Sequence, residues 1–432
     1  MFGKERRRVI LSVLLALCII ALTACTGGGP PSSQNLAEGE KELVVGMLGP
    51  FTGLNARIGD ELKNAVHMAF SEIDYKVGDY RIRFVFADSE SDAEKAARAY
   101  ERMITQENID VGFMNWHSWV SVAVMDIAAD YEIPHFFTFG ADKAINEKYH
   151  SDPERYKYWV GKAWPTAEKL IVGYVETIDS AVKSGAWTPR NKNFAVFGLD
   201  QDWGRSFGAA LRDSFEERGW TCVTEEWFPL GETEFYPVLN KIRSLDVSLL
   251  VGTIADGPSG AAFVKQAREV NIPAIIVQDG LGWQAEWYDL TGDASNYILD
   301  QIPIYTSEQS IRFIEEYREM FGMDPSPSSS GMAYDYARFF IKVLETALEL
   351  HGEITTETLT KVAVEQVKTG NLYFADGVVH KKLMYTPESI PDMVIGEDYY
   401  MFPVIQYMDG EMFAVWPDAA KQMDLRIPDF AR

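Results

Sequence analysis

Cysteine and histidine are scarce in this sequence of 432 residues, which has three cysteines and six histidines. Two of the cysteines, Cys18 and Cys25, lie near the N-terminus, so Cys222 alone is left for the folded part and an internal disulfide is excluded there. No histidine pair has the four-residue spacing of a helical zinc site, and no acidic stretch has the spacing of a calcium loop. The Gly-x-Ser-x-Gly turn of hydrolases and a Gly-rich phosphate loop are also missing. The sequence therefore predicts no metal and no cofactor, and it favours a binding protein over an enzyme.

Positive charge is also in short supply, because 40 lysines and arginines face 64 aspartates and glutamates and give a formal net charge of −24. Residues 1–24 carry four basic residues and one acidic residue, a local charge of +3, so the remainder of the chain carries −27. A surface of this sign repels the phosphate backbone, which makes nucleic acid a poor partner. The charge instead suits an exported protein that must stay apart from its neighbours.

The N-terminal segment has the pattern of a signal peptide. Lys4 and the three arginines at 6–8 precede an uncharged apolar run over residues 9–22. That run is shorter than the ~20 residues that a membrane-spanning helix needs. We therefore predict that residues 1–24 are removed after export.

The end of this segment, Leu22-Thr23-Ala24-Cys25, resembles the bacterial lipoprotein box. The resemblance implies that the Cys25 thiol becomes a thioether to diacylglycerol. Glycine, proline and serine dominate the stretch that follows, so residues 25–42 are predicted to form a flexible tether. The predicted location is the cell membrane, with the protein held by lipid and facing the periplasm or the cell exterior.

From residue 43 onward, apolar runs of five to seven residues alternate with segments of helical spacing. Strands are expected at 43–48, 82–87, 109–114 and 133–139, and after a break at 194–199, 247–253 and 274–278. Alternation of this kind predicts α/β architecture, with parallel sheets covered by helices on both faces. Because the series runs twice, we predict two doubly wound, Rossmann-like lobes with a ligand cleft between them.

Loops at the carboxyl ends of such strands gather at one edge of each sheet, where ligands bind. Five tryptophans lie on the loops expected there: Trp116, Trp119, Trp164, Trp203 and Trp283. Single tryptophans are usually packing residues. Several on converging loops can clamp a planar or apolar ligand, or surround a cation.

Several short motifs, in order along nearly the whole chain after the tether, resemble the branched-chain amino acid and amide-binding group of type I periplasmic binding proteins. These proteins, of which the leucine-binding proteins are typical, are the receptors of ABC importers. The motifs lie at residues 45–53 with 58–59, 86–92, 111–112, 133–134 with 139–141, 198–204, 263–268 and 278–280.

The resemblance implies two lobes that are joined by three crossovers, near residues 160, 302 and 398, and that close over the ligand like a hinge. Lobe 1 would comprise residues 43–160 and 303–398, and lobe 2 residues 161–302 and 399–432. The implied partners are a small-molecule ligand, the permease subunits of an ABC importer and, through Cys25, the membrane. The stretch 378–400 departs from the family pattern, and the sequence assigns it no role.

The resemblance also implies a set of ligand contacts. Ser118 matches a serine whose hydroxyl, with nearby backbone N–H groups, holds a carboxylate or amide oxygen, although a helix N-cap is the alternative. Gly140 and Ala141 match a loop whose main chain contacts the ligand. Asp279 matches an acid that pairs with the ligand ammonium. Asp256 departs from the family, so it either favours a ligand with additional amine or amide hydrogens or caps the following helix.

Two other classes of protein stay open at this stage. A sensory receptor on the same fold would bind its ligand in the same way and signal to a membrane kinase. An exported hydrolase would use a pair of carboxylates in a tryptophan-lined cleft, and Asp256 with Asp279 is the pair to nominate. Arg57 could pair with a ligand carboxylate, although a solvent-facing charge is the simpler interpretation.

Overall fold

The computed structural model describes residues 36–432 except 284 and 306. The predicted signal peptide, the lipid site at Cys25 and most of the predicted tether therefore lie outside the described residues. Within the part that is described, none of the helices combines the length and the apolar character that crossing a membrane requires.

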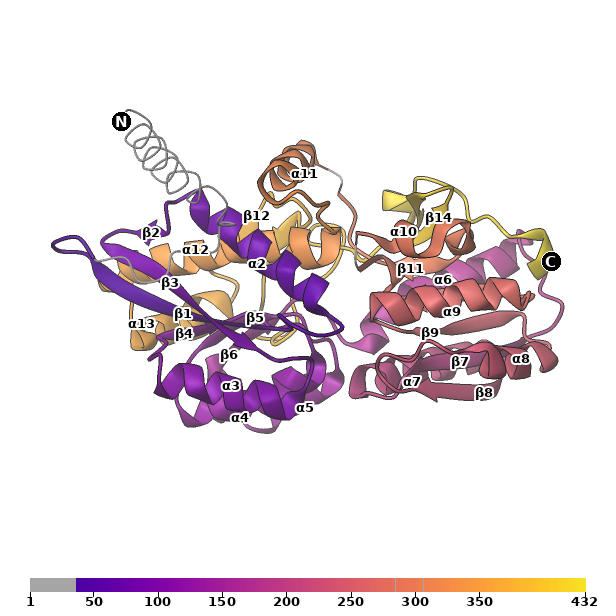
Figure 1. Cartoon of the computed structure of the whole chain (residues 1–432), viewed down its shortest axis with the longest axis horizontal. Helices are drawn as coiled ribbons and strands as arrows, with labels where there is room; N and C mark the ends of the chain where they lie inside the picture. The colour runs from indigo at the N-terminus through magenta and orange to yellow at the C-terminus, as the bar shows by residue number, and fades with distance from the viewer. Residues whose placement is uncertain (1–35, 284, 306) are drawn as a thin grey trace, which may run out of the picture. The chain divides into compact units, whose positions relative to one another are not determined.

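A six-stranded sheet organises lobe 1, with the order β2-β3-β1-β4-β5-β6. Every neighbouring pair is parallel except β2 with β3. Its strands are β1 (Lys41–Gly49), β2 (Lys76–Val77), β3 (Tyr80–Asp88), β4 (Val111–Phe113), β5 (His135–Thr138) and β6 (Trp159–Lys162). The connecting helices are α2 (Ala56–Ser71), α3 (Ala93–Thr105), α4 (Ser118–Asp130) and α5 (Lys143–Ser151), and they cover both faces of the sheet (Figure 1).

Local sequence explains these elements. Strand β1 is buried from Leu43 to its end because helices lie on both of its faces, which is why it reads as a continuous apolar run. Helix α3 begins where the Asp92 carboxylate accepts the backbone N–H of Lys95 at 2.8 Å.

A seven-stranded sheet organises lobe 2, with the order β15-β14-β11-β10-β9-β7-β8. Its strands are β7 (Asn193–Leu199), β8 (Thr221–Phe228), β9 (Leu249–Thr253), β10 (Ile275–Asp279), β11 (Leu299–Gln301), β14 (Val404–Met408) and β15 (Glu411–Trp416). The first five of these strands are parallel, and β14 and β15 add antiparallel pairs at one edge. Its helices are α6 (Ala167–Ser184), α7 (Asp202–Glu216), α8 (Tyr236–Ser244), α9 (Gly257–Glu269) and α10 (Trp287–Thr291).

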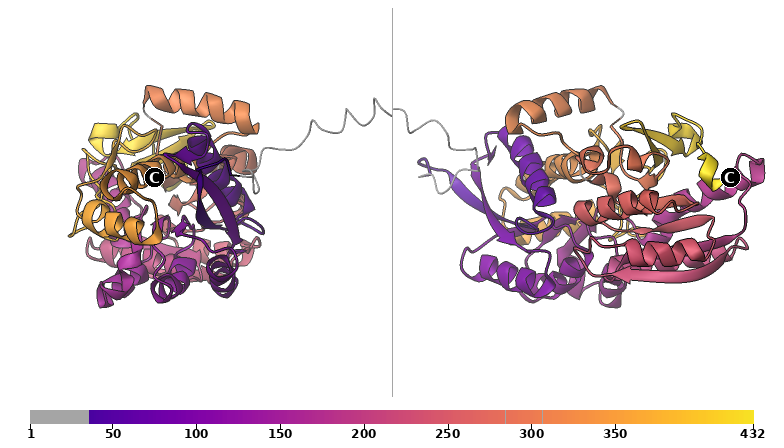
Figure 2. Two further views of the ribbon diagram at one scale, coloured as in Figure 1. Left: turned by 90° about the vertical axis from the view of Figure 1, so that its left-hand side faces the viewer. Right: turned by 45° about the vertical axis from the view of Figure 1, so that its right-hand side comes forward.

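The chain returns to lobe 1 between β11 and β14. Three helices and a two-stranded ribbon are added there: α11 (Glu308–Phe321), α12 (Ala333–His351), α13 (Thr356–Val362), β12 (Phe374–Ala375) and β13 (Lys382–Leu383). Phe340 of α12 stacks on Phe113 of β4, with ring centroids 4.5 Å apart, so α12 belongs to the core of lobe 1. Figure 2 shows this orange segment beside the indigo N-terminal elements. The predicted α/β fold of two doubly wound lobes is confirmed.

Candidate ligand-binding site

A cavity of about 500 Å³, counted with its open mouth, lies at the carboxyl ends of strands from both sheets. This is the edge at which open α/β sheets bind ligands. Loops after β1, β4, β5 and β6 supply one side, and loops after β7, β8, β9 and β10 supply the other. The lining residues are Asn55, Trp116, His117, Ser118, Trp119, Phe139, Ala141, Trp164, Leu199, Trp203, Leu230, Ala255 and Trp283.

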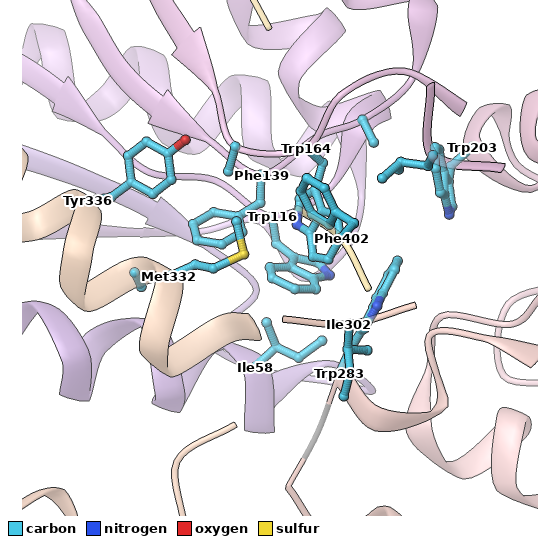
Figure 3. Packing of buried hydrophobic residues seen from close by; sticks show 14 of the residues in the cluster. Ile58, Trp116, Phe139, Trp164, Trp203, Trp283, Ile302, Met332, Tyr336 and Phe402 are labelled. Atoms are coloured by element: carbon cyan, nitrogen blue, oxygen red, sulfur yellow. The ribbon is translucent and has the colours of Figure 1, made fainter. Parts of the chain in front are cut away.

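Five indole rings and one phenyl ring dominate the wall of this cavity. Trp116 stacks on Phe139 with centroids 5.2 Å apart and meets Trp283 edge-on at 5.8 Å. Trp283 in turn lies 5.3 Å from Trp164. Figure 3 shows these rings converging from both lobes, with Trp203 to one side. All five tryptophans that the sequence placed on cleft loops therefore meet at one cavity.

Four buried polar atoms on lining residues have no hydrogen-bond partner among the described residues. Asn55 Nδ2 lies 3.1 Å from His117 Nε2, and because an amide NH₂ can only donate, the imidazole proton must be on Nδ1. Burial lowers the pKa of His117 to about 3, so the ring is neutral. The partnerless atoms are His117 Nδ1, Trp203 Nε1, Trp283 Nε1 and Asn55 Oδ1. They amount to three N–H donors and one acceptor, a set that suits a ligand with oxygen atoms.

Ser118 connects the start of α4 to the loop after β5. Its hydroxyl oxygen accepts the backbone N–H groups of Ala141 at 3.0 Å and Asp142 at 3.1 Å, which leaves the hydroxyl proton free to be donated. A Cβ atom at Gly140 would lie 2.9 Å from the Cα atom of Ser118, so only glycine permits this approach. Ser118 and Ala141 line the cavity, whereas Gly140 packs behind them.

A buried ion pair supports the wall from behind. Lys162 Nζ donates to the carbonyl oxygens of Ala141 at 3.1 Å and Trp164 at 3.0 Å, and it lies 3.0 Å from Asp392 Oδ1. Burial lowers the pKa of Lys162, and Asp392 opposes that effect. Burial alone would raise the pKa of Asp392, but the ammonium groups of Lys162 and Lys169 outweigh it and hold that pKa below its ordinary value.

The contacts of Asp392 show where the stretch 378–400, to which the sequence assigned no role, lies in the fold. The segment lies against the end of β6, where the backbone N–H of Lys162 donates to the carbonyl of Pro391 at 2.8 Å. Sequence reasoning missed both members of the pair. A lysine inside the apolar strand-like run 159–163 was the one signal that could have indicated it.

Asp279 does not line the cavity in this structure. Its carboxylate accepts hydrogen bonds from the hydroxyls of Tyr174 at 2.8 Å and Thr253 at 3.2 Å. Burial and the neighbouring Asp300 carboxylate raise the pKa of Asp279 well above its ordinary value. Asp300 accepts the N–H groups of Gly280 and Gly282, each at 2.8 Å, and so holds the turn that leads to Trp283.

Asp256 and Arg57 also lie away from the lining. The Asp256 carboxylate accepts the N–H of Ser259 at 2.8 Å and caps α9, which is the second of the two roles that the sequence left open. The Arg57 guanidinium does not face solvent as a free charge. It lies 3.2 Å from Glu61 and 2.5 Å from Glu286, so it is paired within the protein.

The family model described as Periplasmic binding protein matches residues 42–384. This chain belongs to the periplasmic binding protein family. The family consists of non-enzymatic solute-binding proteins. Membership therefore decides against the exported hydrolase.

The chain is similar over most of its length to several relatives. It is 23% identical to "Leu/Ile/Val-binding protein homolog 7" of Brucella abortus (strain 2308), covering 96% of this chain and 99% of that protein. A putative branched-chain amino acid ABC transporter protein from Silicibacter pomeroyi has a TM-score of 0.74 at 20% identity, covering 90% and 100% of the two chains. A solute-binding protein from R. palustris, solved in complex with benzoate, has a TM-score of 0.69 at 18% identity, covering 89% and 100%.

Several polar links join the two lobes of this binding protein, and three of them lie around the cavity in addition to those of Asp392. The Ser206 hydroxyl donates to Asp142 Oδ2 at 2.6 Å. Arg57 of α2 pairs with Glu286. The Ser328 hydroxyl donates at 2.8 Å to the carbonyl of Trp283, whose ring forms part of the wall.

Proposed function

We propose that this protein is the extracytoplasmic solute-binding component of an ABC importer, and that it captures a small amine-, amide- or amino-acid-like ligand. One observation carries the proposal: the loops at the carboxyl ends of both sheets enclose a single cavity of aromatic rings with a few partnerless polar atoms. Small-molecule sites have this composition, with apolar walls that hold the body of the ligand and a few polar groups that orient it.

The proposed contacts are Ser118, Ala141, Trp116, Trp119 and Trp164, all of which line the cavity. The Ser118 hydroxyl would donate to an oxygen of the ligand, and the indole rings would enclose its carbon skeleton. Gly140, Asp256 and Asp279 would act from behind, because each supports a loop without lining the cavity. The benzoate complex of the R. palustris relative supports room for planar solutes on this fold.

Closure of the lobes would trap the ligand. We place the lobe boundaries near residues 160, 302 and 398, so that lobe 1 is 43–160 with 303–398 and lobe 2 is 161–302 with 399–432. The chain passes between the two sheets after β6, which ends at Lys162, after β11 and before β14, and this course supports crossovers close to these positions. Lipid on Cys25 would hold the protein near the permease subunits that receive the solute.

A thermal-shift screen of the purified full chain tests this function. The panel should include amino acids, amides, urea, polyamines, aromatic acids and sugars. A ligand at 100-fold above its dissociation constant adds ~2.7 kcal/mol to the stability of the folded state, which raises the melting temperature visibly. The response should disappear in Trp164→Ala and persist in Trp416→Ala, because Trp416 lies on β15 outside the cavity.

Two outcomes would contradict the proposal. One is the absence of any stabilising solute in the panel. The other is a stabilising solute whose effect is the same in Trp164→Ala as in the unsubstituted protein, since that solute would bind elsewhere.

A further inference from the structure

We infer that the ligand carries a methylated ammonium group, as in a quaternary amine or a trimethylated zwitterion, and that the indole rings surround this group. The inference rests on the proposed function and narrows its ligand class. Five of the thirteen residues that line the cavity are tryptophan, and none is isoleucine or valine. An aliphatic ligand needs only apolar area, whereas a cation is attracted by the faces of aromatic rings, of which indole is the best.

The side chains that line the cavity offer a primary ammonium few hydrogen-bond acceptors. Such a group brings three N–H donors that must be satisfied once it leaves water. The lining offers one partnerless side-chain acceptor among the described residues, Asn55 Oδ1, and no aspartate or glutamate. A fully methylated ammonium has no N–H group, so it can be buried against rings without leaving a donor unpaired.

The charges next to the lining favour a cation over an anion. Asp142 follows the lining residue Ala141, and Asp202 precedes Trp203. Burial and the Asp142 carboxylate together raise the pKa of Asp202, so the two acids act on the same region. The Lys162 ammonium, which lies behind the wall, is 3.0 Å from Asp392 and is compensated by it. These two acids therefore favour a cation or a zwitterion over a ligand with an uncompensated carboxylate.

The remaining hydrogen-bond donors of the lining indicate which chemical group the ligand carries at its other end. His117 Nδ1, Trp203 Nε1 and Trp283 Nε1 have no partner among the described residues, and the Ser118 proton is free. All four groups are neutral donors, which suit a carboxylate or hydroxyl oxygen. The ligand class is thus a trimethylammonium compound with an oxygen function a few atoms away.

Isothermal titration of the purified full chain in detergent tests the inference with matched pairs of solutes. Choline and 3,3-dimethylbutan-1-ol have the same shape, and only choline is charged. Choline should bind about 30-fold more tightly, the ratio that corresponds to a desolvated cation–π contact. Trimethylglycine should bind, and glycine, whose ammonium keeps its N–H groups, should bind at least 100-fold more weakly.

Variants of one wall residue separate a cation–π role from a packing role. Trp283→Phe retains an aromatic face, whereas Trp283→Leu retains only apolar bulk. Choline affinity should fall about tenfold from the first variant to the second, while 3,3-dimethylbutan-1-ol should bind both equally. Trp416→Leu, a substitution outside the cavity, should change neither affinity.

Equal binding of choline and its uncharged isostere would overturn the inference and leave the proposed function standing. Binding of isoleucine or benzoate without binding of any methylated ammonium compound would also overturn the inference and leave the proposed function standing. If none of these solutes and none of the wider panel binds, the inference and the proposed function fall together.

Discussion

Replacing Asp392 by asparagine should strongly destabilise this protein. The substitution keeps the shape of the side chain and removes the charge that lies 3.0 Å from Lys162 Nζ and 2.7 Å from Lys169 Nζ. The Lys162 and Asp392 side chains are 0% and 1% exposed, so water cannot replace the lost partner.

The expected cost follows from this geometry. Two unit charges 3.0 Å apart attract by ~5 kcal/mol at an effective dielectric constant of about 20. Breaking a buried pair by removing one partner typically costs about 3–5 kcal/mol, because the other charge stays buried. A domain of this kind has ~5–15 kcal/mol of stability in total, so the variant should lose a large share of it.

Urea unfolding followed by circular dichroism measures the effect, and pH checks its cause. The folded pKa of Asp392 is held below its ordinary value, so this carboxylate stabilises the fold above the unfolded pKa of ~3.9. That contribution is lost as pH falls through the folded pKa. The difference between the two proteins should therefore be full at pH 7 and shrink below about pH 4.

Two matched variants decide the outcome. Lys169→Gln removes a partner that is 48% exposed and should cost at most ~1 kcal/mol. The double variant Lys162→Met with Asp392→Asn should be more stable than the sum of its single changes by about 2 kcal/mol. A cost below about 1 kcal/mol for Asp392→Asn at pH 7, or single effects that simply add, would show that Lys162 and Asp392 do not stabilise the fold as a buried ion pair.

Three further substitutions have defined outcomes. Ser118→Ala leaves the N–H groups of Ala141 and Asp142 without their acceptor, so it should cost ~2 kcal/mol in urea unfolding and weaken ligand binding in titration. An unchanged affinity would remove Ser118 from the proposed contacts. Burial lowers the pKa of Lys368 in the folded state to about 7. Above that pH the unfolded state binds more protons than the folded state, so the free energy of unfolding should rise by about 2 kcal/mol from pH 7 to pH 9. Lys368→Met should abolish that rise, and a slope that persists in the variant would assign it to other groups. Cys25→Ser should abolish incorporation of labelled palmitate and release the protein from membranes after fractionation; membrane retention would contradict the lipid anchor.

The sequence predicted the fold because each lobe is built from parallel strands buried on both faces. Such strands read as short apolar runs, and β1 and β9 are examples. The antiparallel strand β15 was not predicted, because it is only partly buried. The composition of its partner β14 also does not indicate whether the two strands pair in parallel or antiparallel. The edge strands of the lobe 2 sheet are defined by their hydrogen-bonded pairing with neighbouring strands, which a single sequence does not reveal.

Only part of the candidate site was predicted, namely the part that follows from the parallel strands. Tryptophans could be assigned to the cavity because their loops follow strands, and the ends of parallel strands meet. Whether Asp279 faces a ligand or its neighbours depends on Tyr174, which is 105 positions away in the sequence. The same limit applies to the Lys162 and Asp392 pair, because nothing local indicates that two distant segments share a buried charge.

The hydrogen bond from Ser328 to the carbonyl of Trp283 has a kinetic consequence. The wall residue Trp283 is also held by the opposite lobe, so parting of the lobes must break this hydrogen bond and displace one side of the cavity wall. We therefore expect opening of the lobes to speed the release of the solute, and the residence time of the solute to follow the rate at which the lobes part. A permease that pulls at the nearby Arg57 and Glu286 link would shorten that time without touching the solute at all.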